Sequence, residues 1–405
     1  MKSQIRRMVL AGVAGLSAAL IATPVLAQKK YDTGASDTEI VVGGISPYSG
    51  PASAYGAIGK LLTAYFTKVN SEGGINGRKI RFVTYDDGYN PAKTVEMARK
   101  LVEQDEVLFV FNTLGTPPNS AIHKYMNQKK VPQLFVATGA TKWGDPKSFP
   151  WTMGWQPSYQ SEALIYAQHL LQTRPNAKIG ILYQNDDYGK DYLKGFKDGL
   201  GEQGRKQIVA ELTYEVTDPT VDSQLTTLKG SGADAFFNIT TPKFAAQAIK
   251  KMAEIGWKPQ HYLNSVSASV GAVIIPAGPE NAKDVYTVQY LKDPTDAQWA
   301  SFPDYKAWSE FMKKWHPTGD LKDANNVYGY VVAQGLMEVL KKAGDNLTRA
   351  NIMKQAASLD LHSLQMILPG VNVKTSADDF YPIERQQMAQ WNGKSWILDG
   401  KTYGR

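Results

Sequence analysis

Cysteine is absent from the sequence. Its absence excludes disulfide bonds, thiolate zinc sites, a cysteine nucleophile and an acylated cysteine that could act as a lipid anchor. Histidine is scarce, and the five histidines show no metal-ligand spacing such as HExxH. We therefore expect no metal site and no cofactor. The histidines are His123, His169, His261, His316 and His362.

Motifs for catalysis are missing as well. No GxSxG nucleophile elbow occurs, and the Gly-Lys-Ser stretch at 393–395 lacks the first glycine of a phosphate-binding loop, because Met388 stands there. The acidic pairs 86–87 and 186–187 follow strand-like runs, where adjacent side chains point to opposite sides, so loop or cap roles are favoured. We expect no enzymatic activity. An exported hydrolase, which needs a nucleophile with a base in reach, is the alternative.

Long apolar runs are absent except for one near the start, residues 8–22. Basic residues precede this run, Pro24 closes it, and residues 25–27 are of the kind that a signal peptidase recognises. The run is shorter than the roughly 20 residues that span a bilayer. We therefore predict an export signal over residues 1–27, cleaved before Gln28 and followed by a soluble chain, rather than a retained membrane anchor.

A strong charge of one sign is also missing. The formal net charge is +7 at pH 7, and three of these charges lie in the predicted signal, which has no acidic residue, so the remainder carries +4. Lysines are scattered among acids, and no long block of like charge occurs. The sequence therefore gives no support for nucleic-acid binding.

What the sequence does contain is an alternation of short apolar runs with longer amphipathic patterns from residue 39 onward. This alternation predicts an α/β protein with parallel sheets covered by helices. A last hairpin is expected around Asn392 and Gly393. Strands are expected over residues 39–45, 79–85, 107–111, 133–137, 178–183, 233–239, 262–266 and 285–291, and helices over residues 57–71, 92–104, 160–172 and 243–255.

The length is too great for one core and suits two domains. Three crossings of the chain between these domains, near residues 151–157, 285–290 and 364–370, would form a hinge. Ligands of open parallel sheets lie beyond the carboxyl ends of the strands, so two facing domains would trap a ligand between strand-following loops. We assign residues 28–155 with 289–365 to the first lobe and residues 156–288 with 366–405 to the second.

A resemblance to a known family is carried by four segments in a fixed order: 43–56 (GGISPYSGPASAYG), 69–91 (VNSEGGINGRKIRFVTYDDGYNP), 131–141 (VPQLFVATGAT) and 179–189 (IGILYQNDDYG). Several spaced motifs in order are far more specific than any one of them. The segments are similar to the branched-chain amino acid (leucine/isoleucine/valine) binding proteins of ABC importers, and the likeness weakens after about residue 290.

The resemblance implies a type I periplasmic binding fold: two doubly wound parallel-sheet domains joined by a three-stranded hinge that closes around the ligand. It also implies a monomeric, periplasmic solute-binding protein whose closed form is recognised by the permease and ATPase subunits of an ABC importer. A ligand-sensing subunit that reports to a receptor would show the same signals, so this alternative stays open.

The resemblance also locates ligand-binding residues in the first lobe. Tyr55 stands where the family places an aromatic ring over the ligand; alternatively it packs on the following helix. Gly115 and Thr116 stand where the family offers backbone N–H and hydroxyl groups to the ligand's carboxylate; alternatively this loop caps the next helix. Trp155 or Tyr328 would add aromatic surface for an aromatic ligand.

A third loop and a tyrosine of the second lobe complete the expected contacts. Gly139 and Thr141 match the family pattern of this loop. Thr138 is an alternative to them, because the loop in this chain and the loop in the family differ in length by two residues. Tyr188 falls on a family tyrosine that touches the ligand after closure, although a tyrosine before glycine also suits a capping or core position.

The second lobe should also contribute Thr240, where the family often has an aromatic residue, and Ser265 at the next strand end. Family members that bind amino acids carry an acid at that strand end, because a buried ammonium group without a partner is costly. No Asp or Glu lies between Glu254 and Glu280. We therefore expect an aromatic or short aliphatic carboxylate as the ligand, in preference to a branched-chain amino acid.

Overall fold

The structure is a computed structural model that describes residues 29–404. The predicted export signal, residues 1–27, and its cleavage point before Gln28 lie outside this range. Within it, none of the helices combines the length and the apolar character that crossing a membrane requires.

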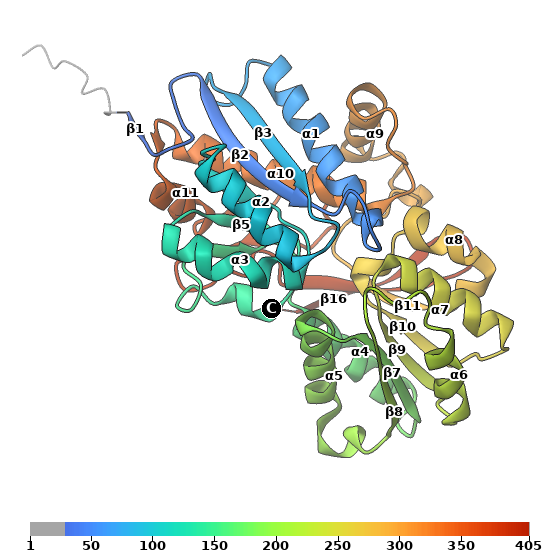
Figure 1. Ribbon diagram of the computed structural model, residues 1–405. Helices are drawn as coiled ribbons and strands as arrows, with labels where there is room; N and C mark the ends of the chain where they lie inside the picture. The colour runs from blue at the N-terminus through green and yellow to red at the C-terminus, as the bar shows by residue number, and fades with distance from the viewer. Residues whose placement is uncertain (1–28, 405) are drawn as a thin grey trace, which may run out of the picture.

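The first sheet consists of five parallel strands, in the spatial order β3 (Lys79–Asp86), β2 (Glu39–Ser46), β4 (Phe109–Phe111), β5 (Gln133–Val136) and β6 (Thr152–Gly154). Both faces of this sheet are covered, so its strands are nearly continuous apolar runs; in β2 every residue after the first is buried. One face packs on α1 (Gly56–Ser71) and α10 (Ala324–Ala343), and the other on α2 (Pro91–Glu103) and α3 (Thr116–Lys129) (Figure 1).

The second sheet has seven strands, in the order β16 (Trp396–Gly404), β15 (Arg385–Trp391), β11 (Tyr286–Gln289), β10 (Gln260–Leu263), β9 (Ala235–Ile239), β7 (Ile179–Gln184) and β8 (Ile208–Tyr214). The five strands from β11 to β8 are parallel to one another. β15 is antiparallel to β11, and β16 is antiparallel to β15. One face packs on α4 (Tyr159–Thr173) and α5 (Asp187–Arg205), and the other on α6 (Asp222–Gly230) and α7 (Pro242–Glu254). The expected pair of doubly wound parallel sheets is thus confirmed.

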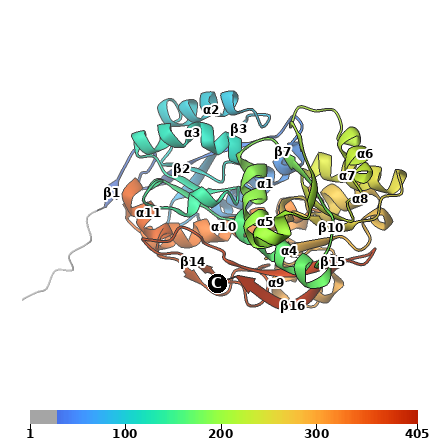
Figure 2. The ribbon, with the colours of Figure 1, turned by 90° about the horizontal axis from the view of Figure 1, so that it is seen from below.

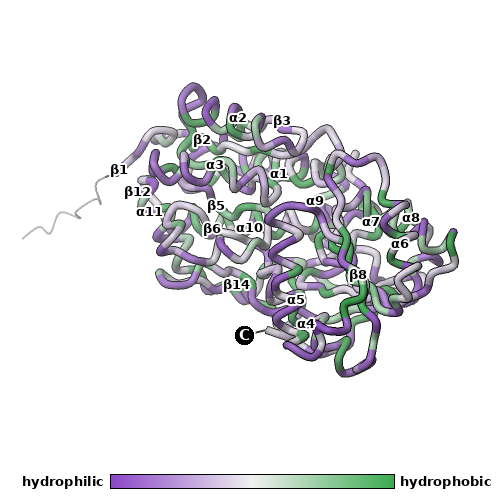
Figure 3. Tube along the Cα trace, turned by 60° about the horizontal axis from the view of Figure 1, so that its bottom comes forward, coloured by the Kyte–Doolittle hydropathy of each residue, from purple (hydrophilic) through white to green (hydrophobic). Residues whose placement is uncertain are grey.

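The remaining elements complete the two lobes. They are α8 (Ile275–Ala277), α9 (Pro303–Trp315), α11 (Arg349–Ala356) and two short strand pairs, β1 (Lys30–Tyr31) with β12 (Asn346–Leu347) and β13 (Asp360–Leu361) with β14 (Val373–Lys374). In Figure 2, β14, β15 and β16 run along one edge of the molecule. Hydrophobic and hydrophilic residues alternate along the helical traces in Figure 3, as expected for helices with one buried face.

The division of the chain into lobes stays a prediction, but the packing of its last part bears on the boundary. Met366, Val373 and Ile383 lie in the hydrophobic core of the first sheet. The chain returns to the second sheet only at β15, which begins at Arg385. This packing favours a boundary near residue 384 rather than at 366.

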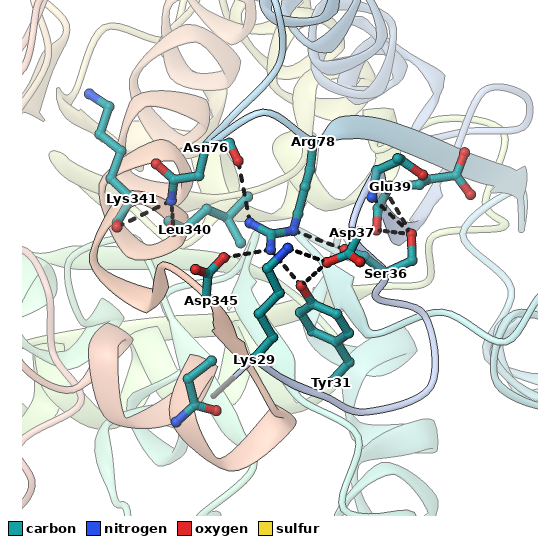
Figure 4. A network of polar contacts seen from close by, with 12 residues as sticks. Lys29, Tyr31, Ser36, Asp37, Glu39, Asn76, Arg78, Leu340, Lys341 and Asp345 are labelled. Carbon is teal, nitrogen blue, oxygen red and sulfur yellow. Dashed lines mark hydrogen bonds and ion pairs between the residues drawn. The ribbon is translucent and has the colours of Figure 1, made fainter. Parts of the chain in front are cut away.

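One buried cation joins the start of the described chain to the first lobe. Arg78 is 2% exposed. Its guanidinium donates to Asp345 Oδ1 at 2.6 Å, to the Tyr31 hydroxyl at 2.7 Å and to the Ser36 carbonyl at 2.9 Å (Figure 4). A buried charge needs such a full set of partners. The contacts hold β1 beside β12, although these strands lie more than 300 residues apart in the sequence.

Three differences from the expected elements have local causes. β8 was not expected because it is an edge strand in which polar residues alternate with apolar ones, and β6 was missed because it has only three residues. The strand expected over residues 262–266 ends at Leu263, and a 3-10 turn over Ser265–Ser267 follows. The last hairpin is confirmed: Asn392 Oδ1 accepts from the N–H groups of Lys394 and Ser395, and Gly393 adopts a φ of 100°.

A buried histidine gives the fold a pH dependence. His261 on β10 is 4% exposed, and burial lowers its pKa to about 3. In the unfolded chain the pKa of this group is near the ordinary histidine value of 6.5. Between pH 6.5 and about pH 3, the unfolded state therefore binds a proton at this histidine, whereas the folded state does not. The stability contributed by His261 is present above pH 6.5 and is lost as the pH falls below it.

We expect His261→Gln to lose less free energy of unfolding than the wild type between pH 6.5 and pH 4, because glutamine does not titrate and still offers an acceptor to the Asn238 amide, 3.2 Å away. Urea unfolding at several pH values measures this slope. The control is His362→Gln, which replaces a histidine that is 71% exposed and lies outside the core. Equal slopes for wild type and His261→Gln would contradict the prediction.

Candidate ligand-binding site

One cavity lies between the two sheets, at the carboxyl ends of their parallel strands. The strand order of the first sheet reverses between β2 and β4, and that of the second between β7 and β9. The loops after these four strands all reach the cavity, through Tyr55, Gly115, Tyr188 and Thr241 respectively. Such switch points are where doubly wound sheets bind ligands, since the loops diverge there and leave a crevice.

Tyrosine is the dominant side chain of the cavity. Six tyrosines line it, and each is between 3% and 8% exposed. Burial raises the pKa of each phenol above its ordinary value, so all six are neutral at pH 7. Their rings offer apolar surface and their hydroxyls offer hydrogen bonds. They are Tyr55, Tyr89, Tyr159, Tyr188, Tyr290 and Tyr328. The hydroxyls of Tyr55 and Tyr188 already donate to backbone carbonyls of the second sheet's loops.

The N-terminus of α3 supplies a donor of another kind. Thr116 is the first helical residue, and Pro117 and Pro118, which follow it, have no N–H. The Thr116 N–H has no hydrogen-bond partner among residues 29–404, whereas the Gly115 N–H donates to the Ala137 carbonyl at 3.1 Å. The positive end of the helix dipole therefore reaches the cavity through one free N–H. This arrangement can hold a carboxylate without a cationic side chain.

The second sheet contributes a serine that is held in place by a buried glutamate. Ser265 lines the cavity, and both its N–H and its hydroxyl donate to the carboxylate of Glu162, at 2.7 Å and 2.6 Å. Glu162 also accepts from the Tyr166 hydroxyl at 2.9 Å, and burial raises its pKa. The acid is therefore fully used in holding the Ser265 turn and is not available to a ligand.

Five of the nine predicted site residues line the cavity: Tyr55, Gly115, Thr116, Tyr188 and Ser265. Their contact with a ligand stays a prediction.

Thr138 and Thr240 lie just behind the cavity wall. The Thr138 hydroxyl lies 2.6 Å from that of Thr116, and the Thr240 carbonyl accepts from the Tyr188 hydroxyl at 3.2 Å. Each of them therefore orients a residue that does line the cavity. In the loop of Thr240 it is the next residue, Thr241, that reaches the cavity.

Gly139 and Thr141 also lie away from the cavity lining. The Gly139 carbonyl accepts from the Tyr159 N–H at 2.8 Å, so it holds the start of α4. Thr141 donates through both its N–H and its hydroxyl to Asp191 Oδ2 on α5, at 2.8 Å and 2.9 Å. Thr141 therefore lies at the junction with α5 and does not line the cavity.

Three of the six tyrosines were not foreseen from the sequence. Tyr89, Tyr159 and Tyr290 line the cavity from the loop after β3, the start of α4 and the chain after β11. Their signal was their position directly after a strand or at a predicted crossing. Of the two further aromatic candidates, Tyr328 lines the cavity, whereas Trp155 is fully buried against Phe135, with ring centroids 4.7 Å apart.

The cavity does hold an acid, although none lies between residues 254 and 280. Asp293, in the chain segment after β11, lines the cavity and is 4% exposed. Asp293 lies outside the strand end near Ser265, and no motif in the sequence marks which residues after β11 turn inward. The absence of an acid at that strand end therefore does not exclude an ammonium group in the ligand.

Two hydrogen bonds join the opposite sides of this cavity. The Tyr55 hydroxyl, from the first lobe, donates to the Val266 carbonyl of the second at 3.1 Å. The Ser269 hydroxyl, from the second lobe, donates to Asp323 Oδ1 at the start of α10, at 2.8 Å. Tyr55 and Ser269 also line the cavity, so the same residues that face a ligand join the lobes.

Comparison with known proteins agrees with this architecture. The sequence matches the family model of the periplasmic binding proteins over residues 39–395. The chain belongs to this family of solute-binding proteins, which confirms the predicted resemblance. One relative, the Leu/Ile/Val-binding protein homolog 1 of Brucella suis, is 26% identical over 320 residues, which cover 77% of this chain and 81% of the relative.

Solved structures share the fold. A branched-chain amino acid ABC transporter protein from Thermus thermophilus with bound valine has a TM-score of 0.79 at 15% identity, covering 91% of this chain and 96% of its own. A solute-binding protein of an ABC transporter from R. palustris in complex with benzoate has a TM-score of 0.74 at 21% identity, covering 89% and 95%.

Gly115 gives a test of the cavity wall. Its φ of 95° is a conformation that L side chains rarely adopt, and an added Cβ would lie 2.3 Å from the Tyr89 ring. Gly77 has a similar φ of 80° but open space around its missing Cβ. We expect Gly115→Ala to lose at least about 1 kcal/mol more unfolding free energy than Gly77→Ala, because the ring must move. Urea unfolding measures both losses, and equal losses would contradict the geometry.

Proposed function

We propose that the protein is the periplasmic solute-binding component of an ABC importer and that it captures a small organic carboxylate by closure of its two lobes. The observation that carries this proposal is the free N–H of Thr116 at the start of α3, set among six neutral tyrosines. These groups are hydrogen-bond donors without net charge, and they suit an anion held next to apolar or aromatic surface.

The ligand class is an aromatic or short aliphatic acid, with a branched-chain amino acid as the second candidate. The valine bound by the Thermus thermophilus protein and the benzoate bound by the R. palustris protein both carry a carboxylate. The tyrosine rings favour the aromatic acid, because offset or edge contacts with an aromatic ring add to the apolar area that is buried.

The proposal includes the working cycle of the protein. Residues 1–27 direct export and are removed, and the chain acts as a monomer in the periplasm. Ligand contacts to both lobes stabilise the closed state, which the permease and ATPase subunits of the importer recognise. The protein catalyses no reaction. A ligand-sensing subunit of a receptor is the alternative, and capture of membrane partners would separate the two.

The carboxylate requirement is tested by pairs of acids and amides. We expect benzoate, phenylpyruvate or 4-methyl-2-oxopentanoate to raise the melting temperature, since a ligand that binds only the folded state stabilises it. Benzamide, which lacks the negative charge, should bind at least about tenfold more weakly than benzoate in calorimetry. Leucine and phenylalanine complete the panel. Tight binding of leucine alone would contradict the preferred ligand class, and stabilisation by no carboxylate would contradict the function.

Thr116→Val tests the contribution of the hydroxyl that lies beside the free N–H of the anion site, because valine keeps that N–H. The exchange keeps the shape but removes the hydroxyl beside Thr138, and we expect the affinity for the best carboxylate to fall about tenfold. Thr67→Val is the matched control, because that hydroxyl bonds to a carbonyl within α1, on the exposed side. Equal affinities for both variants would contradict a role of Thr116 in binding.

A further inference from the structure

The chain segment after β11 brings an incompletely paired carboxylate into the cavity. Asp293 lines the cavity at 4% exposure. Its Oδ1 accepts from the Thr295 N–H at 2.7 Å and from the Thr295 hydroxyl at 2.5 Å. Its Oδ2 has no hydrogen-bond or ion-pair partner within the described part of the chain. Because Asp293 lines the cavity and this oxygen accepts no hydrogen bond from the described chain, it has capacity for a donor of a ligand.

The neighbouring cation, Lys292, does not pair with the Oδ2 atom of Asp293. Lys292 also lines the cavity, but its Nζ lies 2.5 Å from Asp304 Oδ2. The same Nζ lies 5.1 Å from the ring centroid of Trp299 and 4.7 Å from that of Phe302. These contacts hold the ammonium group of Lys292 to α9, so the charge of Asp293 is left without a counter-charge.

We propose that Asp293 determines specificity for a second polar group of the ligand: the captured carboxylate also carries a hydrogen-bond donor, a hydroxyl or an ammonium group, which donates to Asp293 Oδ2. This inference rests on the proposed function and adds to it a requirement at another part of the cavity. A ligand without such a donor leaves Asp293 buried and incompletely paired, which costs affinity.

The two sources of the donor differ in what else they satisfy. Asn325 lines the cavity, and its Nδ2 is buried without a hydrogen-bond partner in the described chain. A hydroxyl can donate to Asp293 and accept from an amide, whereas an ammonium group has no acceptor. The ammonium group instead gains the full charge attraction of Asp293.

Two series of carboxylates test the proposal on the chain without residues 1–27. The first is benzoate, 4-hydroxybenzoate and 4-(aminomethyl)benzoate, and the second is 4-methylpentanoate, 2-hydroxy-4-methylpentanoate and leucine. Each series has a parent without a second donor, a hydroxyl member and an ammonium member. In calorimetry, we expect a donor-bearing member of at least one series to bind about tenfold or more tightly than its parent.

Asp293→Asn should remove this gain and leave the affinity for the parent within about twofold. For a hydroxyl the loss is about tenfold, because the new amide can still donate to its oxygen; for an ammonium group it is about a hundredfold, because two donors then face each other. The control is Asp296→Asn, which removes a charge three residues away whose oxygens both accept from Gln298. It should leave every affinity unchanged.

Parents that bind as tightly as their donor-bearing relatives in both series overturn the proposal, and this comparison needs only the wild-type protein. A uniform loss of affinity for all members in Asp293→Asn also overturns it, because that pattern indicates a structural role. Binding by no member of either series overturns the proposed function instead, and this inference falls with it.

Discussion

All strands of a parallel sheet end at the same edge, and in this protein the ends of two such sheets face one cavity. Parallel strands need covered faces, so both sheets are enclosed by helices, and only the strand-end loops are free to vary. The sheet topology therefore determines which loops face the cavity, whatever side chains they carry. These are the loops after β2, β4, β7 and β9. The repeated strand order of the two sheets gives both lobes a switch point at the same place.

The pairing of buried charges is the second constraint on the cavity, and Asp293 is the exception to it. A buried ion is costly unless it is paired, and two other charged groups at the cavity are committed to partners within the chain. Glu162 is used by Ser265 and Tyr166, and Lys292 is used by Asp304. The tyrosines remain protonated because burial disfavours the phenolate. The cavity consequently presents neutral donors, which can hold an anion that leaves water only when the lobes close.

The sequence was sufficient for the fold class because both periodicity and ordered motifs pointed to it. It was weaker where a residue's role depends on the path of a loop. Thr141 matches the family pattern, yet it donates a hydrogen bond to Asp191 on α5. Thr138, three residues earlier in the same loop, forms a hydrogen bond with Thr116 instead. Sequence order alone does not decide whether a loop residue faces a ligand or a neighbouring helix.

The acid of the cavity illustrates the same limit more sharply. A search for a carboxylate near Ser265 found none, but Asp293 enters from a segment that the motifs do not cover.

The hinge shows why a cavity acid can come from that segment. Asp304, near the start of α9, accepts from Lys292 Nζ and also from the Met366 N–H at 3.0 Å. One carboxylate thereby joins the chain after β11 to the segment around Met366, and Leu291 forms a bridge to Ile367 beside it. With Lys292 held to α9, the adjacent Asp293 is presented to the cavity by the hinge itself. A ligand group bound there would contact the segment about which the lobes turn, so recognition and closure would share one structural element.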